Sequence, residues 1–396
     1  MGRLIPVSSD TRTPGPGANV ALLRKQRDMS QVRLARKAGI SVSLLSKIEV
    51  GDRALSQGVA AALARAMGIT LDEVLGKASI KRDDETTLRD LRSAIRRFDL
   101  PDGAPVDRLI LVRDLDELVR LRGDANLSEV LKRLPGLLSR ATNHAHAAGT
   151  PEAWATVADV YSAVYWLAAR HRWMDLAELA VMKQKTAAER AIPLTGAIAA
   201  RDEAGAFLNS GDFAGGLAIV DRAIVQAESS MEDRDKALGL GLLHLRGLTL
   251  AGRLGDKAEA ERHTSRAWRV AEEFSEDVDV HGIHFGPENT AVHAVATSVD
   301  LEDHRDALDV AHDLNRRRLT LPATRIGPLH MNIARAKLAL GDRDGALNSL
   351  AEAWEVAPQM AKVHPTSQEL LRVLISLHKR SNPVLTKLAK NAKVSI

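Results

Sequence analysis

The stretch Ser30–Leu75 reads SQVRLARKAGISVSLLSKIEVGDRALSQGVAAALARAMGITLDEVL, and its pattern predicts several short amphipathic helices joined by tight turns. Ser30 and Ser41 each precede a segment whose apolar residues recur at helical spacing, so both serines can cap a helix N-terminus. Gly39 stands between these two segments, where a glycine ends one helix before the next begins. We therefore expect the first two helices to be joined by a turn of only a few residues.

The stretch resembles the helix-turn-helix of the Xre/Cro/phage-repressor family. The matching positions run in order as Leu23-Arg24, Met29-Ser30-Gln31, Leu34-Ala35, Gly39-Ile40-Ser41, Leu45-Ser46-Lys47-Ile48-Glu49, Gly51-Asp52-Arg53, Leu63-Ala64, Met67-Gly68-Ile69 and Leu71-Asp72. One position departs, because Leu55 stands where many members have proline. The resemblance implies a lambda-repressor-like DNA-binding domain over residues 19–76.

In that family the second helix of the motif lies in the major groove of DNA, and its first turns contact base edges. Transferred position by position, the resemblance implies base-facing roles for Ser41, Val42, Ser43, Ser46 and Lys47. It implies phosphate-positioning roles for Gln31 and Arg53. The plainer alternatives are a helix cap for Ser41 and a solvated surface lysine for Lys47.

The distribution of charge supports a nucleic-acid partner. Residues 1–80 contain twelve basic and six acidic residues, a net charge of +6, although the whole chain has a net charge of only +4. A basic segment on a near-neutral remainder is typical of a nucleic-acid-binding module. The chain has no cysteine, no long apolar run and no secretory signal pattern, so we expect a cytoplasmic protein without disulfides or membrane contact.

Beyond this module the sequence predicts an all-α fold without strands. Residues 1–18 are rich in proline and glycine and are expected to form a disordered arm. Residues 77–150 are expected to be a linker and helical connector, 151–358 a set of repeats, and 359–396 C-terminal capping helices. The stripe Leu88, Leu91, Ile95 and Phe98 could form a dimer seam, but packing within its own chain is the favoured interpretation.

The repeats are marked by a turn residue followed five positions later by a small residue. The pairs are Arg172/Ala177, Gly211/Gly216, Gly255/Ala260, Glu302/Ala307 and Gly341/Ala346, spaced by 39, 44, 47 and 39 residues. The segments 210–223, 254–267 and 340–353 resemble the tetratricopeptide repeat, in which two helices are joined by a Gly-Asp turn. This resemblance implies an α-solenoid whose first helices line a concave face.

Counting back from the turns gives the polar and aromatic residues expected on that face: Asp159, Ser162, Trp166, Arg201, Asp202, Arg246, Asn289, His293, Asn332 and Arg335. From these we predict a ligand site made by Arg201, Arg246, Asn289, His293, Asn332 and Arg335, since arginine suits carboxylate or phosphate and asparagine suits a peptide backbone. Ordinary polar residues on a wet groove are the alternative for any single one of them.

The two parts together resemble bacterial regulators of the Rgg/PlcR/PrgX peptide-sensing type. That resemblance implies a homodimer that binds a pseudo-palindromic operator in double-stranded DNA, with a signal peptide or a small molecule as effector. The alternative is an adaptor whose repeats dock a partner protein. The sequence contains no Walker loop, dinucleotide fingerprint, HExxH motif or nucleophile elbow, so we expect no enzyme, no cofactor and no metal site.

Overall fold

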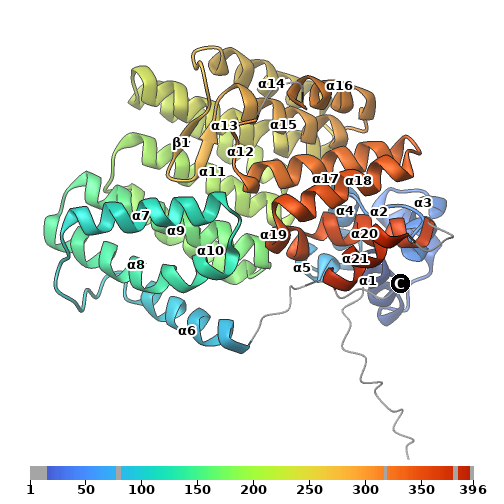
Figure 1. Cartoon of the computed structure of the whole chain (residues 1–396), viewed down its shortest axis with the longest axis horizontal. Helices are drawn as coiled ribbons and strands as arrows, with labels where there is room; N and C mark the ends of the chain where they lie inside the picture. The colour runs from blue at the N-terminus through green and yellow to red at the C-terminus, as the bar shows by residue number, and fades with distance from the viewer. Residues whose placement is uncertain (1–15, 77–81, 316–318, 378–381, 393–396) are drawn as a thin grey trace, which may run out of the picture.

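The computed structural model describes residues 16–76, 82–315, 319–377 and 382–392, and the part so described is almost entirely helical (Figure 1). Most of the arm predicted over residues 1–18 lies outside the described residues, but its last three residues already belong to the first helix. None of the described helices is long and apolar enough to cross a membrane.

Five short helices form an N-terminal domain that we call the head. They are α1 (Pro16–Gln26), α2 (Gln31–Ala38), α3 (Val42–Val50), α4 (Gln57–Met67) and α5 (Leu71–Leu75). The last of them begins with the predicted capping box, in which the Glu73 backbone N–H donates to Thr70 and the Glu73 carboxylate accepts from the Thr70 backbone N–H. The expected short, separately capped helices are confirmed.

The remaining helices form the body. Three come first: α6 (Arg82–Arg96), α7 (Arg108–Gly123) and α8 (Leu127–Ala148). Five helix pairs follow: α9 (Pro151–His171) with α10 (Met174–Ala188), α11 (Pro193–Ser210) with α12 (Phe213–Ser230), α13 (Asp233–Leu254) with α14 (Lys257–Ala271), α15 (Pro287–Asp300) with α16 (His304–Asn315), and α17 (Ala323–Ala339) with α18 (Arg343–Val356). The chain closes with α19 (Pro358–Val363), α20 (Pro365–Leu377) and α21 (Pro383–Ala392).

The turn inside each helix pair has the backbone that the repeat pattern predicts. The predicted turn residues Arg172, Gly211, Gly255, Glu302 and Gly341 all have positive φ, between 58° and 88°. The small residues five positions later, Ala177, Gly216, Ala260, Ala307 and Ala346, are all buried. A left-handed residue ends the first helix, and a small residue then lets the second helix pack closely against it. The helix-pair repeat is confirmed.

The apolar stripe of α6 and the turn that follows it packs within its own chain. Leu88, Leu91, Ile95 and Phe98 are all buried, and α6 contacts α8 and α10. The Phe98 ring lies 5.8 Å from Trp154 and 5.9 Å from Tyr161 between ring centroids. The favoured interpretation of this stripe is therefore confirmed, and α6 serves as part of the core of the first repeats.

The expectation of no strands is wrong at one place. Residues Val278–Val280 (β1) and Ile283–Phe285 (β2) form an antiparallel hairpin. Its two-residue turn, His281 and Gly282, has positive φ at both positions, 50° and 84°, which is the geometry of a tight hairpin turn. The strands are only three residues long, too short to stand out from the surrounding helical periodicity.

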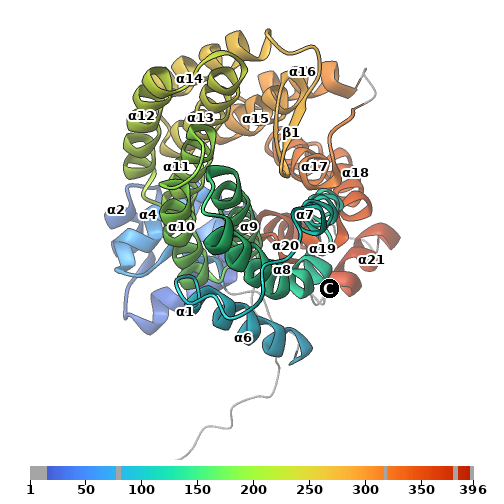
Figure 2. The same cartoon turned by 90° about the vertical axis from the view of Figure 1, so that its left-hand side faces the viewer.

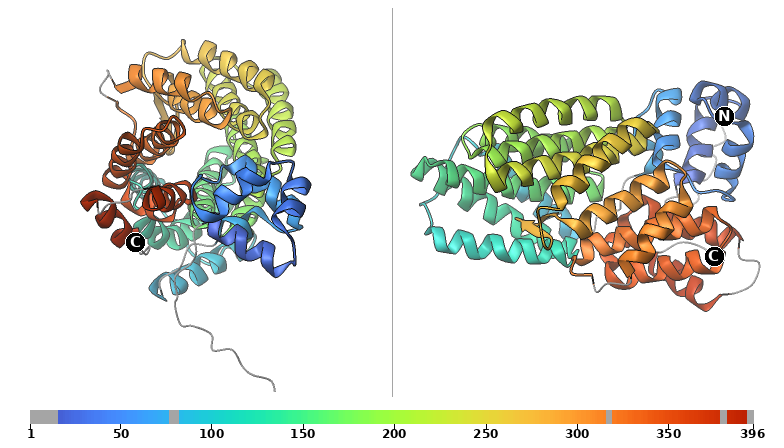
Figure 3. Two further views of the ribbon diagram at one scale, coloured as in Figure 1. Left: turned by 90° about the vertical axis from the view of Figure 1, so that its right-hand side faces the viewer. Right: turned by 90° about the horizontal axis from the view of Figure 1, so that it is seen from above.

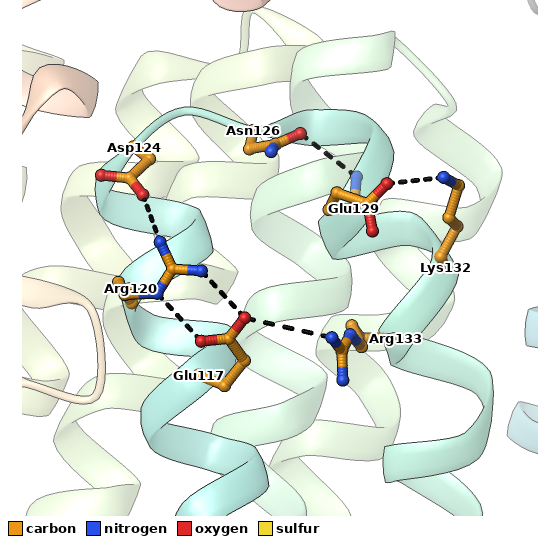
Figure 4. Close-up of polar contacts among 7 residues, drawn as sticks. All are labelled: Glu117, Arg120, Asp124, Asn126, Glu129, Lys132 and Arg133. Atoms are coloured by element: carbon orange, nitrogen blue, oxygen red, sulfur yellow. Dashed lines mark hydrogen bonds and ion pairs between the residues drawn. The ribbon is translucent and has the colours of Figure 1, made fainter.

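The helix pairs curve into a ring (Figure 2). Helix α7 contacts α17, and α9 contacts α19, so the two ends of the body meet. At the ring's first corner an exposed network of ion pairs links α7 to α8: Arg120 lies 2.9 Å from both Glu117 and Asp124, and Arg133 of α8 lies 4.0 Å from Glu117 (Figure 4). Such exposed pairs each contribute little, so the closure depends mainly on buried packing.

The head lies against one end of the ring (Figure 3). Buried apolar residues of the head belong to the same continuous core as residues of α11 to α14. Arg172 in the first repeat turn pairs with Asp72 of α5 at 2.7 Å, and both side chains are mostly buried. Glu369 of α20 accepts hydrogen bonds from the backbone N–H groups of Gly17 and Leu55 at 3.3 and 3.1 Å. Head and body are therefore joined by buried apolar and polar contacts.

Candidate DNA-binding helix and central cavity

The turn between α2 and α3 is fixed by its own short-range contacts. The Ser30 hydroxyl accepts from the Arg33 backbone N–H and the Ser41 hydroxyl accepts from the Leu44 backbone N–H, each at 3.1 Å. Gly39 has a φ of 69°, a left-handed backbone that glycine adopts without steric cost. These contacts set the angle at which α3 leaves α2.

Helix α3 has one buried and one exposed face. Leu45 and Ile48 are 0% exposed and anchor the helix in the head core. The predicted base-facing residues Ser41, Val42, Ser43 and Lys47 are exposed, and Ser46 is half-buried. The predicted residues therefore share the outer face of α3, where hydroxyl, methyl and ammonium groups are available to base edges.

A mostly buried ion pair between Arg24 and Glu49 connects α1 to α3. Arg24 donates from Nε and Nη2 to the two oxygens of Glu49 at 2.7 and 2.8 Å, and Gln31 Nε2 donates to Glu49 at 2.8 Å. Burial alone would raise the pKa of Glu49, but the hydrogen bonds from Arg24 and Gln31 outweigh it and lower that pKa. The amide nitrogen of Gln31 is thus engaged within the head.

Arg53, predicted to contact phosphate, is exposed in the loop after α3. Its guanidinium lies 3.9 Å from Glu302 in the turn between α15 and α16, and both side chains are largely exposed. An exposed pair at this distance contributes little, so Glu302 does not hold the Arg53 guanidinium firmly. The C-terminal end of α3 and the loop that follows it therefore face the body.

Residues 20–74 match the helix-turn-helix family model, so this segment is a helix-turn-helix domain of the Xre type. No curated protein matches the chain. Among solved structures, the chain is similar to Bacillus thuringiensis PlcR in complex with the peptide PapR7 and DNA, with 12% identity, 90% of this chain and 99% of that chain covered, and a TM-score of 0.31. It is also similar to PrgX in a PrgX/iCF10 complex, with 10% identity, 93% and 99% covered, and a TM-score of 0.25.

A cavity of about 260 Å³ lies inside the ring and extends to the head. Three of the six predicted ligand residues line it: Arg201, Arg246 and His293. Ser162, Trp166 and Asp202, also expected on the inner face, line it as well. Asp159 is buried nearby, with its carboxylate 3.5 Å from His281 Nε2, and burial raises its pKa to about 6. The structure therefore brings together the predicted residues from α9, α11, α13 and α15.

Asn289 does not join this cavity. It is 0% exposed, and its amide nitrogen donates to the His284 carbonyl at 2.6 Å. The Asn289 backbone N–H donates to Asp277, which also accepts from Glu288. Asn289 thus fastens the β1–β2 hairpin to the start of α15. We correct its assignment from a ligand contact to a structural residue, because a side chain enclosed on all sides cannot reach a ligand in the ring.

Asn332 and Arg335 lie outside the central cavity. Arg335 donates to Asn332 at 2.9 Å and to Asp300 at 2.7 Å. Asp300 also pairs with Arg253 of α13 at 2.8 Å. Arg335 and Asp300 line a second cavity of about 280 Å³ between head and body, which Lys47 and Arg53 also line. The six predicted ligand residues therefore do not form one site, since α17 begins at the central cavity with Arg325 and reaches the junction with the head near Arg335.

Sequence reasoning missed several residues of the central cavity: Arg122, Arg170, Arg172, Arg253, Arg325 and His364. Arg170, Arg172 and Arg253 stand at or near the ends of first helices, so their clustering near the repeat turns was a detectable signal. Arg122 and His364 come from outside the predicted repeats. They reach the cavity only because the ends of the body meet.

Proposed function

We propose that this chain is a sequence-specific DNA-binding transcription regulator that acts in the cytoplasm as a homodimer. The observation that carries the proposal is the exposed face of α3, whose residues Ser41, Val42, Ser43 and Lys47 stand on a helix anchored by fully buried Leu45 and Ile48. In a helix-turn-helix domain this helix enters the major groove. The surplus of basic residues in the first 80 residues supports the same partner through phosphate contacts.

We also propose that a ligand held by the tetratricopeptide-like body modulates DNA binding. The central cavity supports this, because Gln57 and Leu71 of the head line it together with residues of the body. A ligand there touches both parts, which is the condition for coupling two sites through a change in their relative arrangement. A peptide and a small molecule are both candidates at this level of the proposal.

Chromatin immunoprecipitation of the tagged chain, followed by footprinting of enriched sites, tests the proposal. We expect a limited set of sites with pseudo-palindromic half-sites about 10 bp apart, or a multiple of that spacing. The control is a chain carrying Lys47→Ala, for which occupancy at these sites should fall. Uniform occupancy without discrete sites, together with a stable co-purifying protein, would instead favour the adaptor function.

A further inference from the structure

We propose that the central cavity binds a compact anion with at least two negative charges, carried by phosphate or carboxylate groups, and that this anion is the effector. The inference rests on the proposed regulatory function and names the chemical class of its ligand. Seven arginines line the cavity: Arg122, Arg170, Arg172, Arg201, Arg246, Arg253 and Arg325. They come from α7, α9, α11, α13, α17 and the first repeat turn, so the closure of the ring assembles them.

Acidic residues balance only part of this charge. Arg201 pairs with Asp202 at 2.6 Å, Arg172 with Asp72 at 2.7 Å and Arg253 with Asp300 at 2.8 Å. Within the described parts of the chain, Arg122, Arg170, Arg246 and Arg325 form no ion pair. Asp202 is the one acidic side chain among the described residues that line the cavity. The site therefore carries a positive surplus that an anion would neutralise.

Two of these arginines are buried and the other five are half-buried, so water solvates their charges only in part. Arg122 is 3% exposed and Arg172 is 6% exposed. Burial lowers the pKa of Arg122 to about 10. Burial, reinforced by repulsion from Arg201, Arg246 and Arg122, lowers the pKa of Arg325 to about 9. With pKa values of about 10 and about 9, Arg122 and Arg325 remain cations at neutral pH, and the repulsion between neighbouring guanidinium groups is a cost that a bound anion removes.

Several donors in the cluster also have no acceptor. Arg122 Nε, Arg172 Nη2 and Arg325 Nε are buried, and none of them has a hydrogen-bond partner among the described residues. Buried N–H groups are nearly always paired with protein, water or an ion. Planar guanidinium groups bind phosphate and carboxylate in two-pronged geometry. The open donors thus match the oxygen atoms of such an anion.

The size and lining of the cavity favour a small molecule. Its volume of about 260 Å³ is close to the lower end of the range for small-molecule sites, roughly 300–1,000 Å³. Trp166 lies beneath two of the arginines, with Arg170 at 4.2 Å and Arg122 at 5.5 Å from the ring centroid. This stacking holds the two guanidinium groups in place before a ligand arrives.

The cavity is also connected to the head through Arg172. Its Nε donates to Asp72 of α5, whereas its Nη2 has no partner in the described part of the chain. A bound anion shares this guanidinium with Asp72 and weakens the attraction that holds α5 to the body. The position of the head, and with it the presentation of α3, then depends on whether the cavity is filled.

Isothermal titration of the full chain with inorganic triphosphate and with citrate, at fixed ionic strength, tests the proposal. We expect at least one of these probes to bind with one site per chain, more weakly as ionic strength rises. Binding of triphosphate alone would identify phosphate as the recognised group, and binding of citrate alone would identify carboxylate. Binding of neither probe would overturn the proposal.

Two variants locate the binding. Arg325→Gln and Arg246→Gln should each weaken binding about ten-fold or more, because each removes a charged donor to the anion. The matched control is Arg222→Gln, an exposed position on α12, which should bind as the unmodified chain does. Unchanged binding by both cavity variants would mean that the probes bind adventitiously and would overturn the proposal.

The thermal midpoint without anion gives an independent measurement. Since each cavity variant removes a repelling charge, its midpoint should equal or exceed that of the unmodified chain. A large fall in both variants would mean that these arginines serve the fold, and would contradict a site built for an anion. The affinity for DNA without anion is measured in parallel. If the chain binds DNA specifically but binds neither anion, only this inference is wrong. If it binds an anion but no specific DNA sequence, the proposed function is wrong.

Discussion

Lys47 and Arg53 stand six residues apart, and they illustrate how position decides what a basic side chain does. Lys47 projects from the exposed face of α3, where we propose that it contacts a base edge. Arg53 lies in the following loop, 3.9 Å from Glu302 of the body. The sequence predicted both side chains to be exposed on the DNA-binding side. It could not predict Glu302 beside Arg53, because that contact joins segments that are far apart in the chain.

The two residues should respond differently to truncation. Lys47→Ala should cost ~1–3 kcal/mol of binding free energy on the preferred site and relax the preference at one base. Arg53→Ala should weaken specific and non-specific binding alike and reduce the salt slope by about one. Fluorescence anisotropy with preferred and scrambled duplexes, over a range of salt concentrations, separates the two effects. Equal loss on both duplexes for Lys47→Ala would contradict a base contact.

Gly211 and Gly255 form a matched pair at two repeat turns. Both have a φ near +80°, at 84° and 82°, so alanine at either position should cost ~1–2 kcal/mol in backbone strain. A Cβ at Gly211 would meet the Ala61 Cβ of the head at 3.0 Å, whereas a Cβ at Gly255 meets nothing within 4 Å. Gly211→Ala should therefore lower the urea midpoint more than Gly255→Ala. An equal fall of the urea midpoint in both variants would show that the head does not restrict a side chain at Gly211.

At the level of elements, the helix pairs were predictable because each repeat turn has a local signature. The positive φ at Arg172 and Glu302 shows that the pattern holds even where glycine is absent. The β1–β2 hairpin was missed, although His281-Gly282 between short apolar segments is a recognisable turn signal. Two strands of three residues need the surrounding helices for stability, so their local pattern alone was weak.

The α13–α14 pair contains two buried histidines that should make the fold sensitive to acid. Their Nδ1 atoms lie 3.0 Å apart. Burial lowers the pKa of His244 to about 3, with repulsion from His263, Arg262 and Arg266 as further causes, and burial also lowers the pKa of His263 despite Glu259 nearby. The unfolded chain, with histidine pKa values of about 6.5, binds more protons in this range, so stability should fall as pH drops below about 6.5.

Replacing His244 tests this contribution. His244→Gln keeps a hydrogen-bonding group beside His263 but cannot acquire a proton, so the loss of thermal midpoint between pH 7.5 and 5.5 should become smaller. His312→Gln, at an exposed position on α16, is the matched control and should leave the pH dependence unchanged. If the thermal midpoint of His244→Gln falls between pH 7.5 and 5.5 by as much as that of the unmodified chain, the His244–His263 pair does not cause the sensitivity to acid.

At the level of the whole molecule, the closure of the ring could not be predicted from the sequence. It depends on small rotations that add up over successive helix pairs, and no single residue encodes their sum. Arg122 and His364 therefore reach one cavity from opposite ends of the body. Most of the predicted inner-face residues of α9, α11 and α13 line the central cavity, because their positions depend only on the local helical period, whereas Asp159 is not among the lining residues. Asn289, Asn332 and Arg335 do not line the central cavity, because Asn289 is held by the hairpin and Arg335 lines the second cavity at the junction with the head.

The buried junction also predicts that head and body unfold together. Glu369 is 2% exposed and accepts two backbone N–H groups of the head, while its neighbour Arg372 donates to the Ile48 carbonyl at 2.7 Å. Calorimetry of the unmodified chain should show one transition. Glu369→Ala leaves buried donors unpaired, at ~1–3 kcal/mol each, and should separate an earlier melting of the head. Glu355→Ala, exposed on α18, is the control.

Two separate transitions in the unmodified chain would contradict this junction. Hydrogen exchange then identifies which part opens first, since the backbone amides of α1 to α5 should lose protection together in Glu369→Ala and remain protected in Glu355→Ala. Such coordinated loss would also support the coupling through Arg172 and Asp72.

The most direct test of the central claim is selection of binding sites from a pool of random DNA duplexes by the full chain, repeated with Lys47→Ala. The account predicts enrichment of one pseudo-palindrome with half-sites about one helical turn apart, and a relaxed preference at one symmetric base position for the variant. No enriched sequence, or an identical preference for both proteins, would contradict the assignment of α3 as the helix that reads DNA.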